Sequence, residues 1–165
     1  VTVMSNLGLR RLLADTGIAV HDTKVGDRYV LEALHEHSLS LGGEQSGHII
    51  LADHQTTGDG ILTGLHIAEE MVRTGRTLAE LADQMTVYPQ VLLNVPGVNL
   101  GGLETNQAVA AAVADAQAEL GDSGRVVLRP SGTEPLVRIM VEAASQDEAR
   151  SRAETIAEVV RAELG

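Results

Sequence analysis

The first half of the chain alternates apolar runs typical of strands with segments of helical spacing, and this alternation limits the fold more than any other feature. The runs are rich in valine and isoleucine and lie at 1–4, 17–25 and 47–53. Such residues favour strands, and apolar runs without polar alternation are typical of a parallel sheet. Helical spacing of apolar residues follows at 27–38 and from Asp59 to Gly75. We therefore expect residues 1–84 to form an α/β domain of three layers.

After residue 84 the pattern changes to that of a smaller α+β domain. Two prolines within 87–97 favour an edge strand, so we expect a linker with an edge strand at 85–99. Residues 100–165 then contain a long helix, two strands joined by a turn, and a last helix with one apolar stripe. This order predicts a mainly antiparallel sheet with helices on one face.

The charge of the chain argues against some classes of partner. Asp and Glu number 23 against 12 Lys and Arg, which gives a formal net charge of −11. Because phosphate backbones need a basic protein face, this balance argues against nucleic acid, although a locally basic pocket can still bind a small anion. No apolar run approaches the roughly 20 residues of a membrane span, so we expect no membrane partner.

The chain contains no cysteine, phenylalanine or tryptophan. Its core must therefore be aliphatic, and the lack of disulfides and thiolate metal sites agrees with a cytoplasmic protein. The sequence opens with VTVMS, inside an apolar run and without an initiator methionine. We expect it to be a piece of a longer protein.

The turn predicted between the two strands of the second half holds Ser, Gly and Thr at 131–133, between Arg129 and Arg138. Gly132 allows neighbouring backbone N–H groups to converge on an anion. The hydroxyl and guanidinium groups add donors that suit phosphate. The residues alone leave open an ordinary polar turn, in which Arg129 pairs with Glu134 and Arg138 faces solvent.

A glycine-rich stretch at 41–51 carries Glu44, Ser46 and His48 at alternating positions. In an extended chain these three side chains project to the same side. A carboxylate, a hydroxyl and an imidazole together can bind sugar hydroxyls. The alternative, also left open, is a glycine-rich lead into a strand in which Glu44 simply faces water.

The six histidines do not predict a metal site. His35 and His37 lie two apart on a predicted helix and so face different ways, and the remaining histidines are isolated in the sequence. The segment TTGDG at 56–60 has too few hard ligands for calcium or magnesium. A helix N-terminus capped by Thr57 or Asp59 explains it better.

The motifs GGEQSGH, TTGDGIL and RPSGTEPLVR, in this order, resemble the sugar-binding and phosphate-binding loops of the α-D-phosphohexomutase superfamily. TVMSNLGL, KVGDRYV and Gln45 narrow the resemblance to its bacterial branch that acts on glucosamine phosphates. Members have four domains. The resemblance implies that residues 1–84 are the third domain without its leading segment, and that residues 100–165 are the fourth.

The activity that the resemblance implies for the parent enzyme is the conversion of glucosamine 6-phosphate to glucosamine 1-phosphate through glucosamine 1,6-bisphosphate. The product feeds an amino-sugar nucleotide used in cell-wall synthesis. In the family a phosphoserine of the first domain and Mg²⁺ held by the second carry the chemistry, and neither motif occurs in these 165 residues. We therefore expect the isolated chain to be inactive without the N-terminal domains. A non-catalytic sugar-phosphate-binding module is the alternative.

The resemblance also implies roles for individual residues. Glu44 and Ser46 would hold ring hydroxyls, and His48 would lie near the reacting hydroxyl as the candidate acid or base. The distal phosphate would be bound by residues of the second half: Arg129, Ser131, Gly132 and Thr133.

Two further groups have less defined roles by resemblance. Arg138 would bind the phosphate or brace its loop from the strand. The stretch in which the family tunes its choice of sugar contains three charged residues: Lys24, Asp27 and Arg28.

Overall fold

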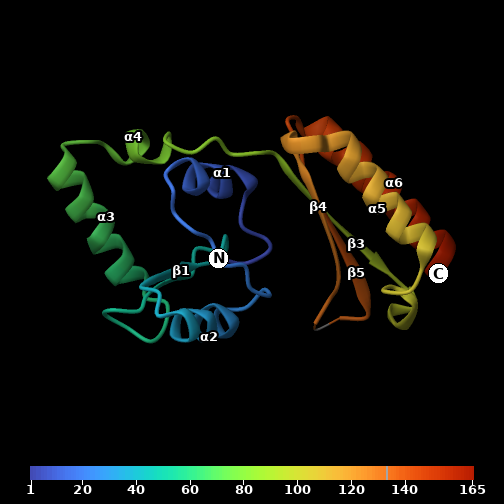
Figure 1. Cartoon of the computed structure of the whole chain (residues 1–165), viewed down its shortest axis with the longest axis horizontal. Coiled ribbons are helices and arrows are strands. Elements are labelled where there is room, and N and C mark those ends of the chain that lie inside the picture. The colour runs from blue at the N-terminus through green and yellow to red at the C-terminus, as the bar shows by residue number, and fades with distance from the viewer. Residues whose placement is uncertain (133) are drawn as a thin grey trace. The chain divides into compact units, whose positions relative to one another are not determined.

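The computed structural model describes residues 1–132 and 134–165, and the chain divides into two compact units, Val1–Val87 and Tyr88–Gly165. Each unit is described by itself. Figure 1 shows the first in blue to green and the second in green to red. In the part of the chain that is described, no helix is long and apolar enough to cross a membrane.

The first unit consists mainly of helices with one short hairpin. Its elements are α1 (Leu7–Asp15), α2 (Asp27–His37), β1 (Leu41–Gly43), β2 (Ile49–Leu51), α3 (Gly60–Thr74) and α4 (Leu78–Ala82). β1 and β2 pair antiparallel, with Leu41 opposite Leu51. The core of this unit is small and joins α2 to the hairpin through Val30, Leu34 and Ile50.

The strands expected at 1–4 and 17–25 are reduced to a single parallel bridge between Thr2 and Thr23. Two backbone hydrogen bonds hold it, from Val3 N to Thr23 O at 3.0 Å and from Thr23 N to Val1 O at 2.9 Å. Polar side chains after residue 20 interrupt the apolar run, so the segment lacks the two buried faces that a parallel strand needs. The α/β class is confirmed, but its strands are shorter than the sequence predicts.

Helix α3 begins where the sequence places its cap. Asp59 is the N-cap residue, and its carboxylate accepts hydrogen bonds from the backbone N–H groups of Ile61 and Leu62, both at 2.9 Å. Since the first N–H groups of a helix have no acceptor within it, this carboxylate satisfies two of them. The TTGDG segment is therefore a helix start, as predicted.

We expect Asp59→Ala to lower the free energy of unfolding by about 1 kcal/mol, because two N–H groups of α3 lose their acceptor. Asp59→Asn keeps an oxygen that can accept and should retain most of the stability. Denaturant unfolding followed by far-ultraviolet circular dichroism measures both variants. Equal losses in the two would contradict a capping role.

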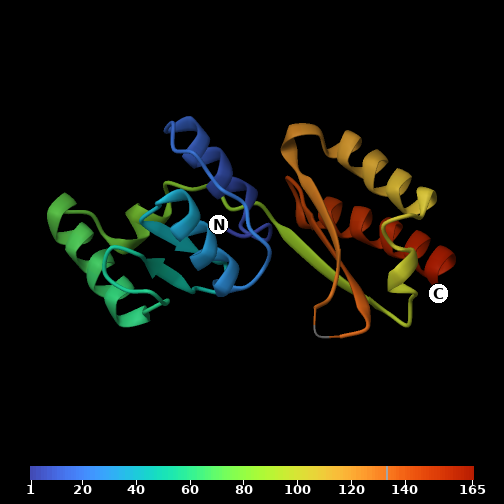
Figure 2. The same ribbon diagram turned by 60° about the horizontal axis from the view of Figure 1, so that its bottom comes forward.

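The second unit is a three-stranded sheet with helices on one face. Its elements are β3 (Gln90–Pro96), a 3-10 turn (Leu100–Gly102), α5 (Gln107–Leu120), a second 3-10 turn (Gly121–Ser123), β4 (Arg125–Pro130), β5 (Leu136–Glu142) and α6 (Gln146–Leu164). The strand order is β3-β5-β4, and both pairs are antiparallel. Figures 1 and 2 show α5 and α6 side by side over the same face. The predicted α+β class is confirmed.

The core of this unit lies between the sheet and α6. The central strand β5 contributes Val137, Ile139 and Val141, and α6 packs its apolar stripe against them. β3 contributes Val91 and Val95, so the expected linker at 85–99 contains a strand that is integral to the sheet. Its prolines stand before and at the end of the strand, which leaves the N–H groups between them free to pair.

Candidate functional site

The first candidate site is the turn of the β1–β2 hairpin, residues 44–48. Gly47 has φ 88°, in the left-handed region that favours glycine, and it reverses the chain. Its N–H donates to Glu44 O, and the N–H of Glu44 donates to His48 O, both at 3.0 Å. The expectation that Glu44, Ser46 and His48 alternate along an extended segment is therefore wrong. Instead, Glu44 and His48 lie opposite each other across the turn.

Glu44 is held by the segment that precedes α2. Its Oε1 accepts a hydrogen bond from the N–H of Gly26 at 2.9 Å. Gly26 is the N-cap residue of α2 and has φ 132° and ψ 131°, a conformation that suits glycine. The positive end of the helix dipole also favours a carboxylate at this place. The interpretation in which Glu44 simply faces water is therefore wrong.

His48 lies between Asp27 and Gly58. Its side chain is 40% exposed, and its Nε2 lies 3.4 Å from Oδ2 of Asp27. Nε2 itself is buried and has no hydrogen-bond partner within the described residues. On the other side, a Cβ atom placed on Gly58 would lie 2.3 Å from Nε2 and from Cδ2 of the ring, so the imidazole rests directly against backbone.

The other two residues of the sugar-choice stretch have partners elsewhere. Lys24 Nζ lies 5.9 Å from the centroid of the Tyr29 ring, a cation–π contact. Arg28 Nε donates to Glu32 Oε1 at 2.8 Å, and this hydrogen bond raises the pKa of Arg28. Of the three charged residues in this stretch, Asp27 is thus the one that meets the 44–48 turn.

Two glycines of this site, Gly26 and Gly58, are not among the residues that the sequence predicts for it. Each stands directly before an aspartate at a helix start, in the dipeptide Gly-Asp of KVGDRYV and of TTGDGIL. The repeated dipeptide is a signal in the sequence. What it could not reveal is that both glycines contact the same hairpin turn, because that contact joins segments far apart along the chain.

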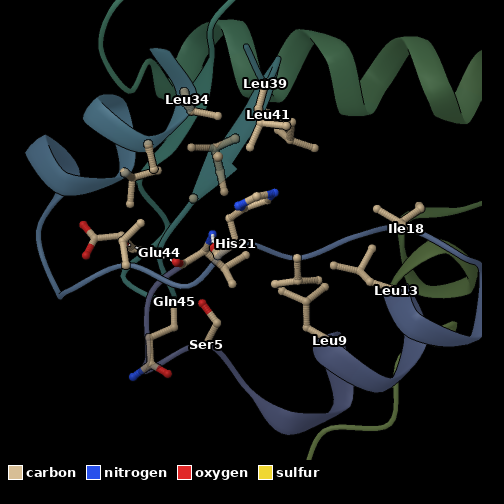
Figure 3. Close-up of a pocket in the computed structure, with 18 of the residues that line it drawn as sticks. Ser5, Leu9, Leu13, Ile18, His21, Leu34, Leu39, Leu41, Glu44 and Gln45 are labelled. Atoms are coloured by element: carbon tan, nitrogen blue, oxygen red, sulfur yellow. Dashed lines mark hydrogen bonds between the residues drawn. The ribbon is translucent and has the colours of Figure 1, made fainter. Parts of the chain in front are cut away.

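A cavity of about 650 Å³ lies beside the turn in the first unit. Figure 3 shows Leu9, Leu13 and Ile18 at one side of it and Glu44 and Gln45 at the other. Its walls are mainly aliphatic, whereas a sugar needs many hydrogen-bonding partners. The polar turn, and not this cavity, is the candidate for sugar recognition.

The second candidate site lies in the second unit, where β4 turns into β5. Arg129 and Arg138 are directly opposite each other in the register of the two strands. Arg138 Nη2 donates to Glu134 Oε2 at 2.9 Å. Arg129 Nε is buried, and within residues 1–132 and 134–165 no acid pairs with Arg129. The pairing expected for an ordinary polar turn, Glu134 with Arg129, is therefore wrong, because Glu134 pairs with Arg138.

Electrostatics at this turn favour an anion. Burial lowers the pKa of Arg129, and the positive charge of Arg138 lowers it further. Like charges on directly opposite residues are destabilising, so a bound anion would relieve the repulsion. Ser131 N donates to Leu136 O at 2.9 Å and closes the turn.

Gly132 leaves the backbone of the turn open. A Cβ atom there would meet nothing within 4 Å. Its φ is not among the positive values, so the turn does not need glycine for a left-handed conformation. Thr133, the fourth expected phosphate ligand, lies outside the described residues.

Two pairs of histidines from separate segments of the first unit have their rings close together and tilted. The ring centroids of His21 and His37 are 4.3 Å apart, and those of His54 and His66 are 5.0 Å apart. Neither pair has further ligands among the described residues close enough to bind a metal with it. The described part of the chain contains no group of three or more His, Cys, Asp or Glu that could hold a metal ion.

Comparison with known proteins shows the family. Residues 1–88 match the family described as phosphoglucomutase/phosphomannomutase, alpha/beta/alpha domain III, and residues 92–159 match the C-terminal domain of phosphoglucomutase/phosphomannomutase. The chain therefore belongs to the phosphoglucomutase/phosphomannomutase family. This confirms the phosphohexomutase resemblance of its motifs.

Two similar curated proteins are both named phosphoglucosamine mutase. The one from Thermobifida fusca (strain YX) is 62% identical over 164 residues, which cover 99% of this chain and 36% of that relative. The one from Salinispora tropica is 61% identical over 160 residues, which cover 97% of this chain and 36% of that relative. The chain thus spans about a third of the length of these relatives.

Solved structures of N-acetylphosphoglucosamine mutase from Aspergillus fumigatus have a similar fold. One has a TM-score of 0.84 at 22% identity and covers 98% of this chain and 37% of that chain. Another, described as a complex with GlcNAc-6P and magnesium, has a TM-score of 0.80 at 20% identity, covering 98% of this chain and 38% of that one. At such identities the likeness shows the fold alone, an α/β domain followed by an α+β domain.

Proposed function

We propose that this chain supplies the sugar-binding and distal-phosphate-binding parts of a phosphoglucosamine mutase, which interconverts glucosamine 6-phosphate and glucosamine 1-phosphate. The observation that carries the proposal is the opposed pair Arg129 and Arg138, where only Arg138 has an acidic partner among the described residues. A guanidinium without an acid, at an open glycine-containing turn, suits a phosphate. The relatives named phosphoglucosamine mutase support glucosamine phosphate as the substrate.

One of the two sites binds the phosphate and the other binds the sugar. The phosphate that is not transferred is gripped by the turn of the second unit: Arg129, Ser131, Gly132 and Thr133, with Arg138 as a brace. Glu44 and Ser46 hold ring hydroxyls, and His48 takes or gives a proton at the reacting hydroxyl. Because the intermediate is glucosamine 1,6-bisphosphate, the sugar must bind in two orientations. A fixed phosphate anchor with tolerant hydroxyl contacts meets that requirement, and such positioning lowers the barrier of the phosphoryl transfer.

The metal of the reaction belongs to another part of the parent enzyme in this proposal. Phosphoryl transfer by the parent uses Mg²⁺, which neutralises charge on the transferred group. The described residues of this chain provide no cluster of ligands for it, so no role assigned to this chain passes through the metal. The remaining partner is the N-terminal part of the same enzyme, and a chain without cysteine suits the cytoplasm as the place of reaction.

The test is a chimera in which this chain replaces the matching third of the Thermobifida fusca relative. We expect the chimera to convert glucosamine 6-phosphate and the isolated chain to be inactive, because the chain lacks the phosphoserine and metal motifs. A coupled assay of glucosamine 1-phosphate formation measures both. Turnover by the isolated chain, or a folded chimera that binds substrate without converting it, would contradict the proposal. The second outcome would favour a non-catalytic binding module.

A further inference from the structure

Three segments that are far apart in the sequence meet at the imidazole of His48. The hairpin turn carries the ring, the start of α2 places Asp27 Oδ2 at 3.4 Å from Nε2, and Gly58 lies so close that a Cβ atom on it would be 2.3 Å from the ring. The sequence motifs assign Asp27 to the choice of sugar and Gly58 to a helix start. Neither assignment explains why both touch the same side chain.

Asp27 is itself held in place. Its Oδ1 accepts a hydrogen bond from the backbone N–H of Arg28 at 2.7 Å, and its Oδ2 lies 3.4 Å from Nε2 of the imidazole. It also stands in the first turn of α2, where the helix dipole favours a negative charge. The carboxylate is therefore a fixed negative charge 3.4 Å from Nε2, although no hydrogen bond joins the two.

The two nitrogens of His48 have different surroundings. Nε2 is buried although the side chain as a whole is 40% exposed, so the exposure belongs to other atoms of the side chain. A neutral imidazole carries one N–H, and an acceptor beside one nitrogen favours the proton there. With the N–H on Nε2, the free lone pair is on Nδ1.

We propose that Asp27 and Gly58 are positioning residues for His48. Asp27 keeps the N–H on Nε2, so that Nδ1 is the nitrogen that exchanges a proton with the substrate hydroxyl, and Gly58 gives the ring the space to lie there. The proposal rests on the proposed function in one respect, the use of His48 in proton transfer. It assigns Asp27 a role through His48 in place of direct contact with the sugar.

Gly58 is needed for space and not for backbone conformation. Its φ is not in the left-handed region, so alanine fits the backbone, but the added Cβ would lie 2.3 Å from Nε2 and Cδ2. Atoms do not approach this closely, so the ring must leave its position. Gly58→Ala therefore displaces the imidazole without removing any polar group from the site.

The kinetic test uses the chimera with Asp27→Asn and Gly58→Ala. We expect kcat to fall by about 100-fold in each, the lower range for loss of general acid–base catalysis, while KM for glucosamine 6-phosphate changes little. Matched controls are Glu36→Gln, which removes the same charge from the exposed face of α2, and Gly64→Ala, where a Cβ meets nothing within 4 Å. Both controls should keep the kcat of the chimera.

The spectroscopic test uses the 165-residue chain and needs no activity. Nitrogen-15 NMR of the His48 ring reports which nitrogen carries the proton. We expect Nε2–H in the unsubstituted chain and a shift toward Nδ1–H in Asp27→Asn, because the asparagine amide can donate to Nε2. The Glu36→Gln chain should keep the original form.

The outcomes separate this proposal from the proposed function. An inactive chimera would count against the mutase, while the NMR signature would still test Asp27 and His48. An active chimera in which Asp27→Asn raises KM and leaves kcat unchanged would overturn positioning in favour of sugar contact. Nδ1–H in the unsubstituted chain would overturn it as well.

Discussion

Arg129→Ala should weaken the binding of glucosamine 6-phosphate to the chain by roughly 10- to 100-fold, the range expected for the loss of a charge-assisted hydrogen bond. Arg129 is partly buried beside Arg138, and no acid within the described residues compensates its charge. The guanidinium is thus available to an anion. Calorimetric titration of the sugar phosphate into the chain and into the variant measures the loss.

Two further variants separate the loss of a phosphate contact from the loss of one positive charge anywhere in the chain. Arg129→Lys keeps the charge but loses the planar fork, so its affinity should fall between those of the parent chain and Arg129→Ala. Arg161→Ala removes the same charge from the exposed surface of α6 and should bind like the parent chain. Equal affinities of Arg129→Ala and Arg161→Ala would overturn the phosphate site.

Stability distinguishes a lost ligand contact from a damaged fold. Because Arg129 and Arg138 repel each other across β4 and β5, removing one charge should leave the unligated chain at least as stable. If the isolated chain binds too weakly for calorimetry, KM of the chimera replaces the titration, and Arg129→Ala should raise it. A KM that does not move would contradict the anchor.

The long helices and the hairpin of the second unit could be predicted from the sequence because their signals are local. Helix α3 has its cap at Asp59, and α6 has an unbroken apolar stripe on one face. The hairpin of β4 and β5 follows from two apolar runs around one turn, and it places Arg129 opposite Arg138 once the register is known. These features depend on neighbours in the sequence, which a periodicity can detect.

The 44–48 turn was mispredicted for a physical reason. Alternating positions of Glu44, Ser46 and His48 fit an extended segment, but the left-handed φ of Gly47 reverses the chain, and nothing in the spacing reveals that angle. The same limit applies to the closeness of the His21 and His37 rings, which depends on how distant segments pack. The candidate residues were thus identified by type, while their mutual geometry required the structure.

Arg125→Met should be the most destabilising substitution considered, lowering the free energy of unfolding by about 3–5 kcal/mol. Glu142 is 0% exposed, and its two carboxylate oxygens are bound by Arg125 Nε and by Gln90 Nε2. The three residues come from β4, β3 and β5, directly opposite one another in the register, so the carboxylate joins all three strands. Removing the guanidinium takes away the cation that Glu142 pairs with, while the carboxylate stays buried.

The matched control is Arg152→Met, which breaks the ion pair with Glu119 between α6 and α5. Because that pair is partly exposed to water on both sides, its loss should cost less than about 1 kcal/mol. The double variant Arg125→Met with Glu142→Met should regain most of the stability lost by Arg125→Met, since two apolar side chains replace the pair without leaving a charge behind. Denaturant unfolding of the unsubstituted chain and the three variants measures these free energies. If Arg125→Met costs no more than Arg152→Met, or if the double variant is as unstable as Arg125→Met, the buried charge of Glu142 is not what makes this position sensitive.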